Sequence, residues 1–194
     1  MKKIIIITGI LCLAGSISIE SGQRTSTQDM RQSILNERLM SAILSNKKVD
    51  IQPLIKAGAD PNVYNQDGNT VLMLAILHGN FELVRILIAA RGIALNRQNN
   101  KGDTALMLAI LRDNLDIVST LIRVKTRLNT QNNDGNTALM LAVLRGNLVL
   151  IRLLIGTRGL ALNIQNNDGN TALMLASLQG RVDVVKVLMA AGAR

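Results

Sequence analysis

A nine-residue sequence, Asp-Gly-Asn-Thr-Ala-Leu-Met-Leu-Ala, stands at residues 134–142 and returns unchanged at residues 168–176. It recurs with one substitution at residues 67–75 and with two at residues 101–109. If each repeat unit starts at the first residue of this sequence, the units span residues 67–100, 101–133 and 134–167, followed by a shorter unit at residues 168–194. A fixed period of this length is typical of a stacked array of supersecondary units. A single core with one active cleft is therefore not expected.

Each unit carries its own signals for a tight turn followed by a helix. Asn-Asp-Gly favours a turn, because Gly accepts positive φ and the Asn and Asp side chains bond the local backbone. The next residue is a Thr, which can cap a helix through its side-chain oxygen. The Leu-Met-Leu-Ala run that follows supplies an apolar helical face. The predicted caps are Thr70, Thr104, Thr137 and Thr171.

A breaker ends each first helix, and a second apolar run follows. The breakers are Gly79, Asp113, Gly146 and Gly180, and the second runs are residues 83–89, 117–122, 150–155 and 184–190. Isolated helices under about 12 residues are marginal in water, so these pairs need their neighbours. A small residue in each first helix would let the helices approach closely: Ala75, Ala109, Ala142 and Ala176.

These residues resemble the ankyrin repeat, whose pattern includes Thr-Pro-Leu-His-x-Ala on a period of about 33 residues. Residues 137–142 match its Thr, Leu and Ala positions, and residues 57–62 are similar to its inter-repeat Gly-Ala-Asp segment. The resemblance covers residues 37–194. It implies an all-α fold, an ankyrin-repeat solenoid of about five stacked helix-turn-helix units joined by short β-hairpin turns.

Two positions depart from the family pattern. The Pro position holds Val71, Ala105, Ala138 and Ala172, which removes a residue preorganised for the first helical turn. The His position holds Met73, Met107, Met140 and Met174, so the side-chain-to-backbone bonds that the family draws from that His are expected to be absent. The helical spacing of the Met residues predicts core packing. Lower rigidity, and not a different fold, is the expected consequence.

The N-terminus has the features of a secretory signal peptide over residues 1–18. A basic head, Lys2-Lys3, precedes an apolar run at residues 4–13 and small residues after it. The run is short for a bilayer span, which takes about 20 residues, so removal is favoured over the alternative of an N-terminal membrane anchor. Lipidation of Cys12 is a weaker alternative, because Leu11 precedes it. The expected product is a periplasmic or secreted protein of bacterial type, without cysteine and hence without a disulfide.

The remaining segments complete the predicted organisation. Residues 19–28 are polar and form a flexible linker, and residues 29–66 form a degenerate N-terminal capping repeat with a polar outer face. In the shortened C-terminal repeat, five residues make the last helix apolar on more than one side: Val182, Val184, Val185, Val187 and Met189. Either this is a modest imperfection of a terminal repeat, or this end docks on another subunit, as in self-association, or on another protein.

No constellation for catalysis, cofactor binding or metal binding is expected. His78 is the only histidine, and no nucleophile elbow or phosphate-cradling Gly-rich loop occurs. A calcium loop needs several acidic oxygens within about 12 residues, whereas residues 132–136 offer one carboxylate. The sequence therefore predicts a protein that is not an enzyme.

The resemblance implies a concave, protein-binding face formed by the residues after the conserved Ala of each first helix and by the hairpin tips. The helix residues are Leu44, Leu77, Leu111, Leu144 and Leu178, with a partly basic column beside them of Ser45, His78, Arg112, Arg145 and Gln179. The tips are Tyr64, Gln66, Gln98, Asn100, Gln131, Asn133, Gln165 and Asn167. An extended or helical protein segment with apolar and some acidic side chains is the expected partner. The alternative is that repeat duplication copied a Leu that partly covers neighbouring helices.

The charge leaves a second function class open. The net charge is +9 with a pI near 10.5, which favours acidic partners or anionic surfaces. Nucleic acid is the weaker candidate, because only 1% of residues are aromatic and single-stranded nucleic acid is bound largely by stacking. The alternative function is thus a basic, nonspecific binder of anionic surfaces or nucleic acid.

Overall fold

The computed structural model describes residues 27–46 and 51–194. The predicted signal peptide and most of the predicted linker lie outside these residues. Within them the chain forms ten helices: α1 (Thr27–Leu44), α2 (Ile51–Lys56), α3 (Val71–Leu77), α4 (Phe81–Ile88), α5 (Ala105–Leu111), α6 (Leu115–Arg123), α7 (Ala138–Arg145), α8 (Leu148–Ile155), α9 (Ala172–Leu178) and α10 (Val182–Ala190).

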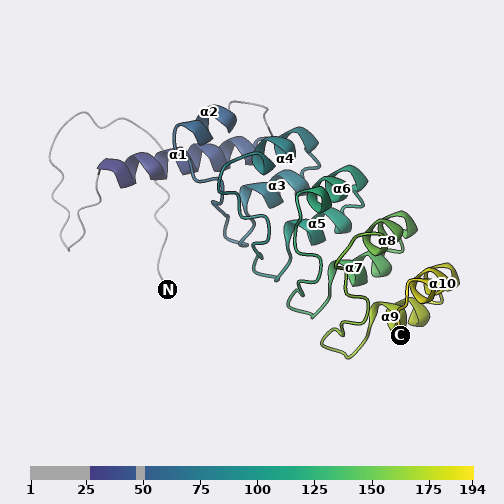
Figure 1. Ribbon diagram of the computed structural model, residues 1–194. Coiled ribbons are helices and arrows are strands. Elements are labelled where there is room, and N and C mark those ends of the chain that lie inside the picture. The colour runs from purple at the N-terminus through teal and green to yellow at the C-terminus, as the bar shows by residue number, and fades with distance from the viewer. Residues whose placement is uncertain (1–26, 47–50) are drawn as a thin grey trace.

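The helices form two layers that progress along one axis (Figure 1). The first helices of the repeats, α3, α5, α7 and α9, lie side by side, and the second helices α4, α6, α8 and α10 lie behind them. The connecting hairpins project together from one side of the array. Within the described ranges no strand forms, and the hairpins carry only isolated antiparallel bridges, Tyr64 to Thr70 and Gln98 to Thr104. The predicted all-α solenoid is confirmed.

Threonine caps begin the inner helices, as the sequence predicts. Thr104 Oγ1 accepts a hydrogen bond from the Met107 backbone N–H, at 3.3 Å, and the same bond occurs in the other three repeats. The Met position corrects one expectation. Met107 Sδ accepts from the Thr104 N–H at 3.4 Å, and Met73 and Met140 make the equivalent bond. A side-chain-to-backbone bond therefore persists at this position, although thioether sulfur is a weak acceptor.

The core is continuous along the stack and is filled mainly by the inner helices. All six residues from Val71 to Ile76 are buried, and the small Ala of each repeat is fully buried, which permits the close helix approach. Complete burial of a Leu, Ile or Met side chain contributes about 1.5–3 kcal/mol. The predicted core position of Met is confirmed for Met73, Met107 and Met140, each 1% exposed, but Met174 is 44% exposed in the last repeat.

The hairpins are joined by side-chain amides and by close backbone contact. Asn133 Nδ2 donates to the Asn100 carbonyl at 2.9 Å, and its backbone N–H donates to the Lys101 carbonyl at 3.0 Å. At Gly102, whose φ is +77°, a Cβ would lie 2.6 Å from the Asn133 backbone nitrogen. Gly is thus required at this tip both for its backbone conformation and for the space that it leaves.

The first repeat differs from the others in its long helix. α1 begins at Thr27, two residues inside the segment predicted as linker. Its polar residues divide in two groups: Arg31 and Glu37 are exposed, whereas Gln32 and Asn36 hold the end of the same repeat. Gln32 Nε2 donates to the Gly58 carbonyl, and Asn36 Oδ1 accepts from the Asp60 N–H at 2.8 Å. None of the described helices is long and apolar enough to cross a membrane.

Apolar side chains are exposed on the last repeat. Leu178, Val182 and Met189 are 74%, 63% and 61% exposed. Arg181, which precedes α10, makes no side-chain capping bond. Of the predicted apolar residues of α10, Val182 and Met189 are thus exposed, whereas Val184 is buried and Val185 and Val187 pack partly against the core. The use of this helix in self-association remains a prediction.

Candidate protein-binding groove

The predicted leucine column lies at the C-terminal ends of the inner helices. Leu77, Leu111 and Leu178 are the last residues of α3, α5 and α9, Leu44 is the last of α1, and Leu144 is the penultimate residue of α7. Their exposure differs along the stack. Leu77 and Leu111 are half-buried, Leu144 is 37% exposed and Leu44 is 53% exposed. The column is thus accessible to a partner, most of all toward the ends of the array.

A hollow of about 370 Å³ joins two of these leucines to the hairpins of the neighbouring repeats. Leu77 and Leu111 form its helix side together with Leu108. Its hairpin side comprises Asp67, Asn69, Asn99, Asn100, Lys101 and Asp103. The structure therefore brings together two predicted helix positions and one predicted tip position, Asn100, as the two walls of one concave site.

The hairpin wall of this hollow carries all three of its charged lining residues. Asp103 is only 6% exposed, and its Oδ1 accepts a hydrogen bond from Asn132 Nδ2 at 3.0 Å. Asp67 and Lys101 are exposed at the tips of adjacent hairpins. Two carboxylates and one ammonium group thus border the apolar surface of Leu77 and Leu111.

The partly basic column follows the leucines at the ends of the inner helices. His78, Arg112 and Gln179 are the C-cap residues of α3, α5 and α9, and all three are exposed. Arg145 differs because its guanidinium bonds the Asp113 carboxylate at 2.7 Å. Arg112 makes no ion pair with any described residue, so it is the arginine of this column that is available to an acidic ligand. Ser45 is exposed after α1 and donates to the Ala42 carbonyl.

Most of the predicted tip residues also hold the hairpins to one another. Gln98 Nε2 donates within its hairpin to the Gly102 carbonyl at 2.6 Å and across to the Gln131 carbonyl at 2.9 Å. Gln131 repeats the pattern toward Gln165. The Nδ2 groups of Asn100, Asn133 and Asn167 each donate to a carbonyl of the preceding hairpin, which for Asn100 is that of Gln66. These amide donors stabilise the stack, a use that the sequence analysis did not assign.

Tyr64 is the one aromatic side chain among the tips. It is 56% exposed, and the Arg97 guanidinium lies over its ring, 4.1 Å from the centroid. Such a contact contributes about 0.5–1 kcal/mol at an exposed site. It gives the first hairpin a flat surface with a positive charge above it.

The comparisons with known proteins agree with this architecture. The family described as ankyrin repeats (3 copies) matches residues 39–132 and 113–194, which together take in most of the chain. The chain belongs to the ankyrin-repeat family. Ankyrin repeats are generally protein–protein interaction modules, and the family is typically non-catalytic. No curated protein sequence matches the chain significantly.

The hollow of this ankyrin array is also lined by residues that the sequence did not identify as site candidates. Lys101 and Asp103 are the two positions at which the nine-residue sequence of the second full repeat differs from residues 134–142, and both line the hollow. That departure from the repeat was the signal that could have identified them. Leu108 gave no such signal, because all four copies of the nine-residue sequence have a Leu at this position. The ankyrin stack holds no group of three metal-ligating side chains within its described part.

Proposed function

We propose that the concave groove of this ankyrin-repeat protein binds a segment of a partner protein and carries out no catalysis. The observation that carries the proposal is the hollow in which Leu77 and Leu111 face the hairpin residues Asp67, Lys101 and Asp103. Concave sites with apolar walls and a few placed polar groups are the usual form of a recognition site.

The residues of the groove favour a partner segment with apolar and charged side chains. Its apolar side chains would cover the leucine column, and each Leu that becomes fully desolvated would add at most about 1.5–3 kcal/mol before the costs of association. An acidic side chain of the segment would meet Arg112 on the helix side. A basic or amide side chain would meet Asp67 on the hairpin side. Such charge complementarity would set the direction in which the segment lies.

The place where this interaction occurs is a separate proposal. We infer export through the N-terminal segment, on the basis of its basic head and apolar run. Mass spectrometry of the protein recovered from its own cell would give the mature N-terminus, and cross-linking in the same cell would give its neighbours. A mature N-terminus at Met1 with the protein retained in the cytoplasm would contradict export.

Paired substitutions test the groove once a neighbour has been identified. Leu111→Glu combined with Leu144→Glu is expected to abolish capture of that partner by the purified protein. If Leu111→Glu disrupts folding, Leu144→Glu alone replaces the pair, because Leu144 is 37% exposed and its substitution should leave the fold intact. Val149→Glu is the matched control, because Val149 is 58% exposed on α8 and lies outside the groove. Equal loss of binding in the control, or retained binding in both groove variants, would place the site elsewhere.

A further inference from the structure

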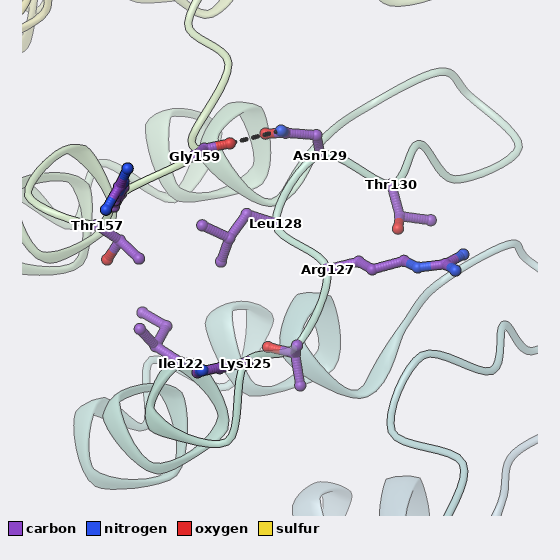
Figure 2. Close-up of a pocket in the computed structure, with 10 residues that line it drawn as sticks. Ile122, Lys125, Arg127, Leu128, Asn129, Thr130, Thr157 and Gly159 are labelled. Atoms are coloured by element: carbon purple, nitrogen blue, oxygen red, sulfur yellow. Dashed lines mark hydrogen bonds between the residues drawn. The ribbon is translucent and has the colours of Figure 1, made fainter.

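A second, larger hollow lies away from the leucine column. It has a volume of about 740 Å³ and is bordered by the end of α6, by the connection that follows it and by residues 157–159 after α8. Figure 2 shows Leu128 pointing into the space between Ile122 and Thr157. Asn129 Nδ2 donates to the Gly159 carbonyl at 2.8 Å, which holds the two connections together at the edge of this space. The hollow is thus built by two adjacent repeats.

The hollow coincides with the one shortened connection among the full repeats. Residues 90–96 and 157–163 run Ala/Thr-Arg-Gly-Ile/Leu-Ala-Leu-Asn, whereas residues 124–129 lack the Gly. Lys125 adopts the positive φ, +60°, that Gly92 and Gly159 adopt in the longer connections. Thr126 then replaces an apolar residue, Ile93 or Leu160, that packs against the core in those repeats. A smaller side chain on a shorter connection leaves room between the second helices.

The walls of the hollow are positive and contain no carboxylate. Lys125, Arg127 and Arg158 line it, and none of them forms an ion pair with a described residue. The sequence has no Asp or Glu at residues 117–133 or 135–167. Positive side chains that have no acidic neighbours raise the local concentration of anions and favour anion binding. Counted from the N-cap residues Asn114 and Asn147, Lys125 and Arg158 hold equivalent sequence positions in adjacent repeats, although Lys125 adopts the backbone conformation of Gly159. Both residues line the hollow, one from each connection.

The floor of the hollow is apolar, in contrast to its walls. Leu128 is 9% exposed and Ile122 is half-buried against the core. Arg127 extends to the opposite side of the connection from Leu128, so it adds charge at the edge and leaves the floor open (Figure 2). A volume of this size lies within the range of about 300–1,000 Å³ that small-molecule sites occupy. The lining therefore fits a ligand with an apolar body and an anionic head.

We propose that this hollow binds an anionic amphiphile, with a phosphate head between Lys125 and Arg158 and a short alkyl chain on Ile122 and Leu128. The ligand comes from one of two sources, a soluble organic phosphate or the headgroup and first methylenes of an anionic lipid. The proposal is independent of the concave groove, since it uses other residues on another part of the surface.

Titration calorimetry with hexyl phosphate tests the proposal on the intact protein. One saturable site is expected, with hexyl glucoside and inorganic phosphate each binding at least tenfold more weakly, because each supplies only half of the ligand. Lys125→Gln combined with Arg158→Gln is expected to weaken hexyl phosphate binding at least tenfold. Arg91→Gln is the matched control, because Arg91 has the equivalent position in the first full repeat and does not line this hollow. It should change the affinity less than twofold.

A shape variant and a vesicle experiment complete the test. Insertion of one alanine between Arg127 and Leu128 restores the length of the other connections while keeping every charge, and it should abolish the site. Sedimentation with vesicles of phosphatidylcholine containing phosphatidylglycerol distinguishes the two sources of the ligand. If Lys125→Gln combined with Arg158→Gln reduces vesicle binding and Arg91→Gln does not, the ligand is the lipid. If the protein binds free hexyl phosphate but not the vesicles, the ligand is the soluble phosphate. Equal losses in all charge variants, unchanged binding after the insertion, or no saturable binding would overturn the proposal.

Discussion

Arg145 donates a hydrogen bond to the Asp113 carboxylate across a repeat boundary, with 2.7 Å between Nη2 and Oδ2. Asp113 ends the turn after α5 at a φ of +53°, a conformation that Asp and Asn tolerate better than other side chains. Its second oxygen accepts from Asn147 Nδ2 at 3.2 Å. One carboxylate thus bonds two residues of the next repeat, and it occupies the position that holds a Gly in the other full repeats.

The Asp113–Arg145 pair predicts a pH-dependent coupling between repeats. The Arg145 hydrogen bond holds the pKa of Asp113 below its usual value, against an opposing contribution from desolvation. Because the folded pKa is the lower one, the stabilisation is present above the unfolded pKa of about 3.9 and is lost as the pH falls through the folded pKa. A double-mutant cycle of Asp113→Asn and Arg145→Gln, measured by urea unfolding, should give about 0.2–1 kcal/mol at pH 7. An equal coupling well below pH 3.9 would contradict this assignment.

The glycines at the hairpin tips predict that Gly102→Ala and Gly169→Ala cost different amounts of stability. Gly102 and Gly169 share a φ of +77°, but a Cβ on Gly169 has no neighbour within 4 Å. Gly169→Ala should therefore cost only the left-handed backbone strain, about 1–2 kcal/mol. Gly102→Ala adds a clash with the Asn133 backbone, and overpacking of this kind costs about 1–3 kcal/mol more. Equal losses of unfolding free energy in urea would show that hairpin contact contributes nothing.

The burial of the repeated methionine predicts that its replacement costs less stability in the last repeat than in the middle of the stack. Met107→Ala should destabilise by about 2–5 kcal/mol, because it leaves a cavity in a fully buried site. Met174→Ala should cost clearly less, since that side chain is 44% exposed. Met107→Leu separates packing from the sulfur acceptor, and a cost below about 1.5 kcal/mol is expected if volume dominates. Thermal unfolding followed by circular dichroism measures all three, and a larger cost for Met107→Leu would assign the main role to the sulfur bond.

The repeat period and its turn and cap residues were sufficient to predict the solenoid. Thr104 and Gly102 act through local backbone geometry, which a sequence pattern records directly. The hydrogen bonds by which side-chain amides link neighbouring hairpins were not predictable in the same way. Gln98 and Asn100 are polar residues at exposed tips, and only the spacing between stacked hairpins shows that their donors bond the next and the preceding repeat.

The candidate sites were predictable only in part for a related reason. Leu111 lines the hollow opposite the hairpins, at a position that follows from the repeat register. The hollow at Lys125 arises where the register is broken by one missing residue. A consensus describes what the repeats share, whereas both candidate ligand hollows depend on residues of the 101–133 repeat that differ from it.

The family's proline position predicts opposite effects in two repeats. Ala138 is the first residue of α7, and its cap Thr137 has φ −86° and ψ 169°, the extended conformation that a residue before proline adopts. Ala138→Pro should stabilise the protein by about 0.4–1 kcal/mol, because it restricts the unfolded chain at a position where no N–H bond is needed. Val71→Pro occupies the equivalent position, but the Val71 N–H donates to the Val63 carbonyl at 3.0 Å, so the same change removes a hydrogen bond and should destabilise. Urea unfolding of the two variants decides the point: the same sign of change in both would mean that this bond does not distinguish the first full repeat from the third.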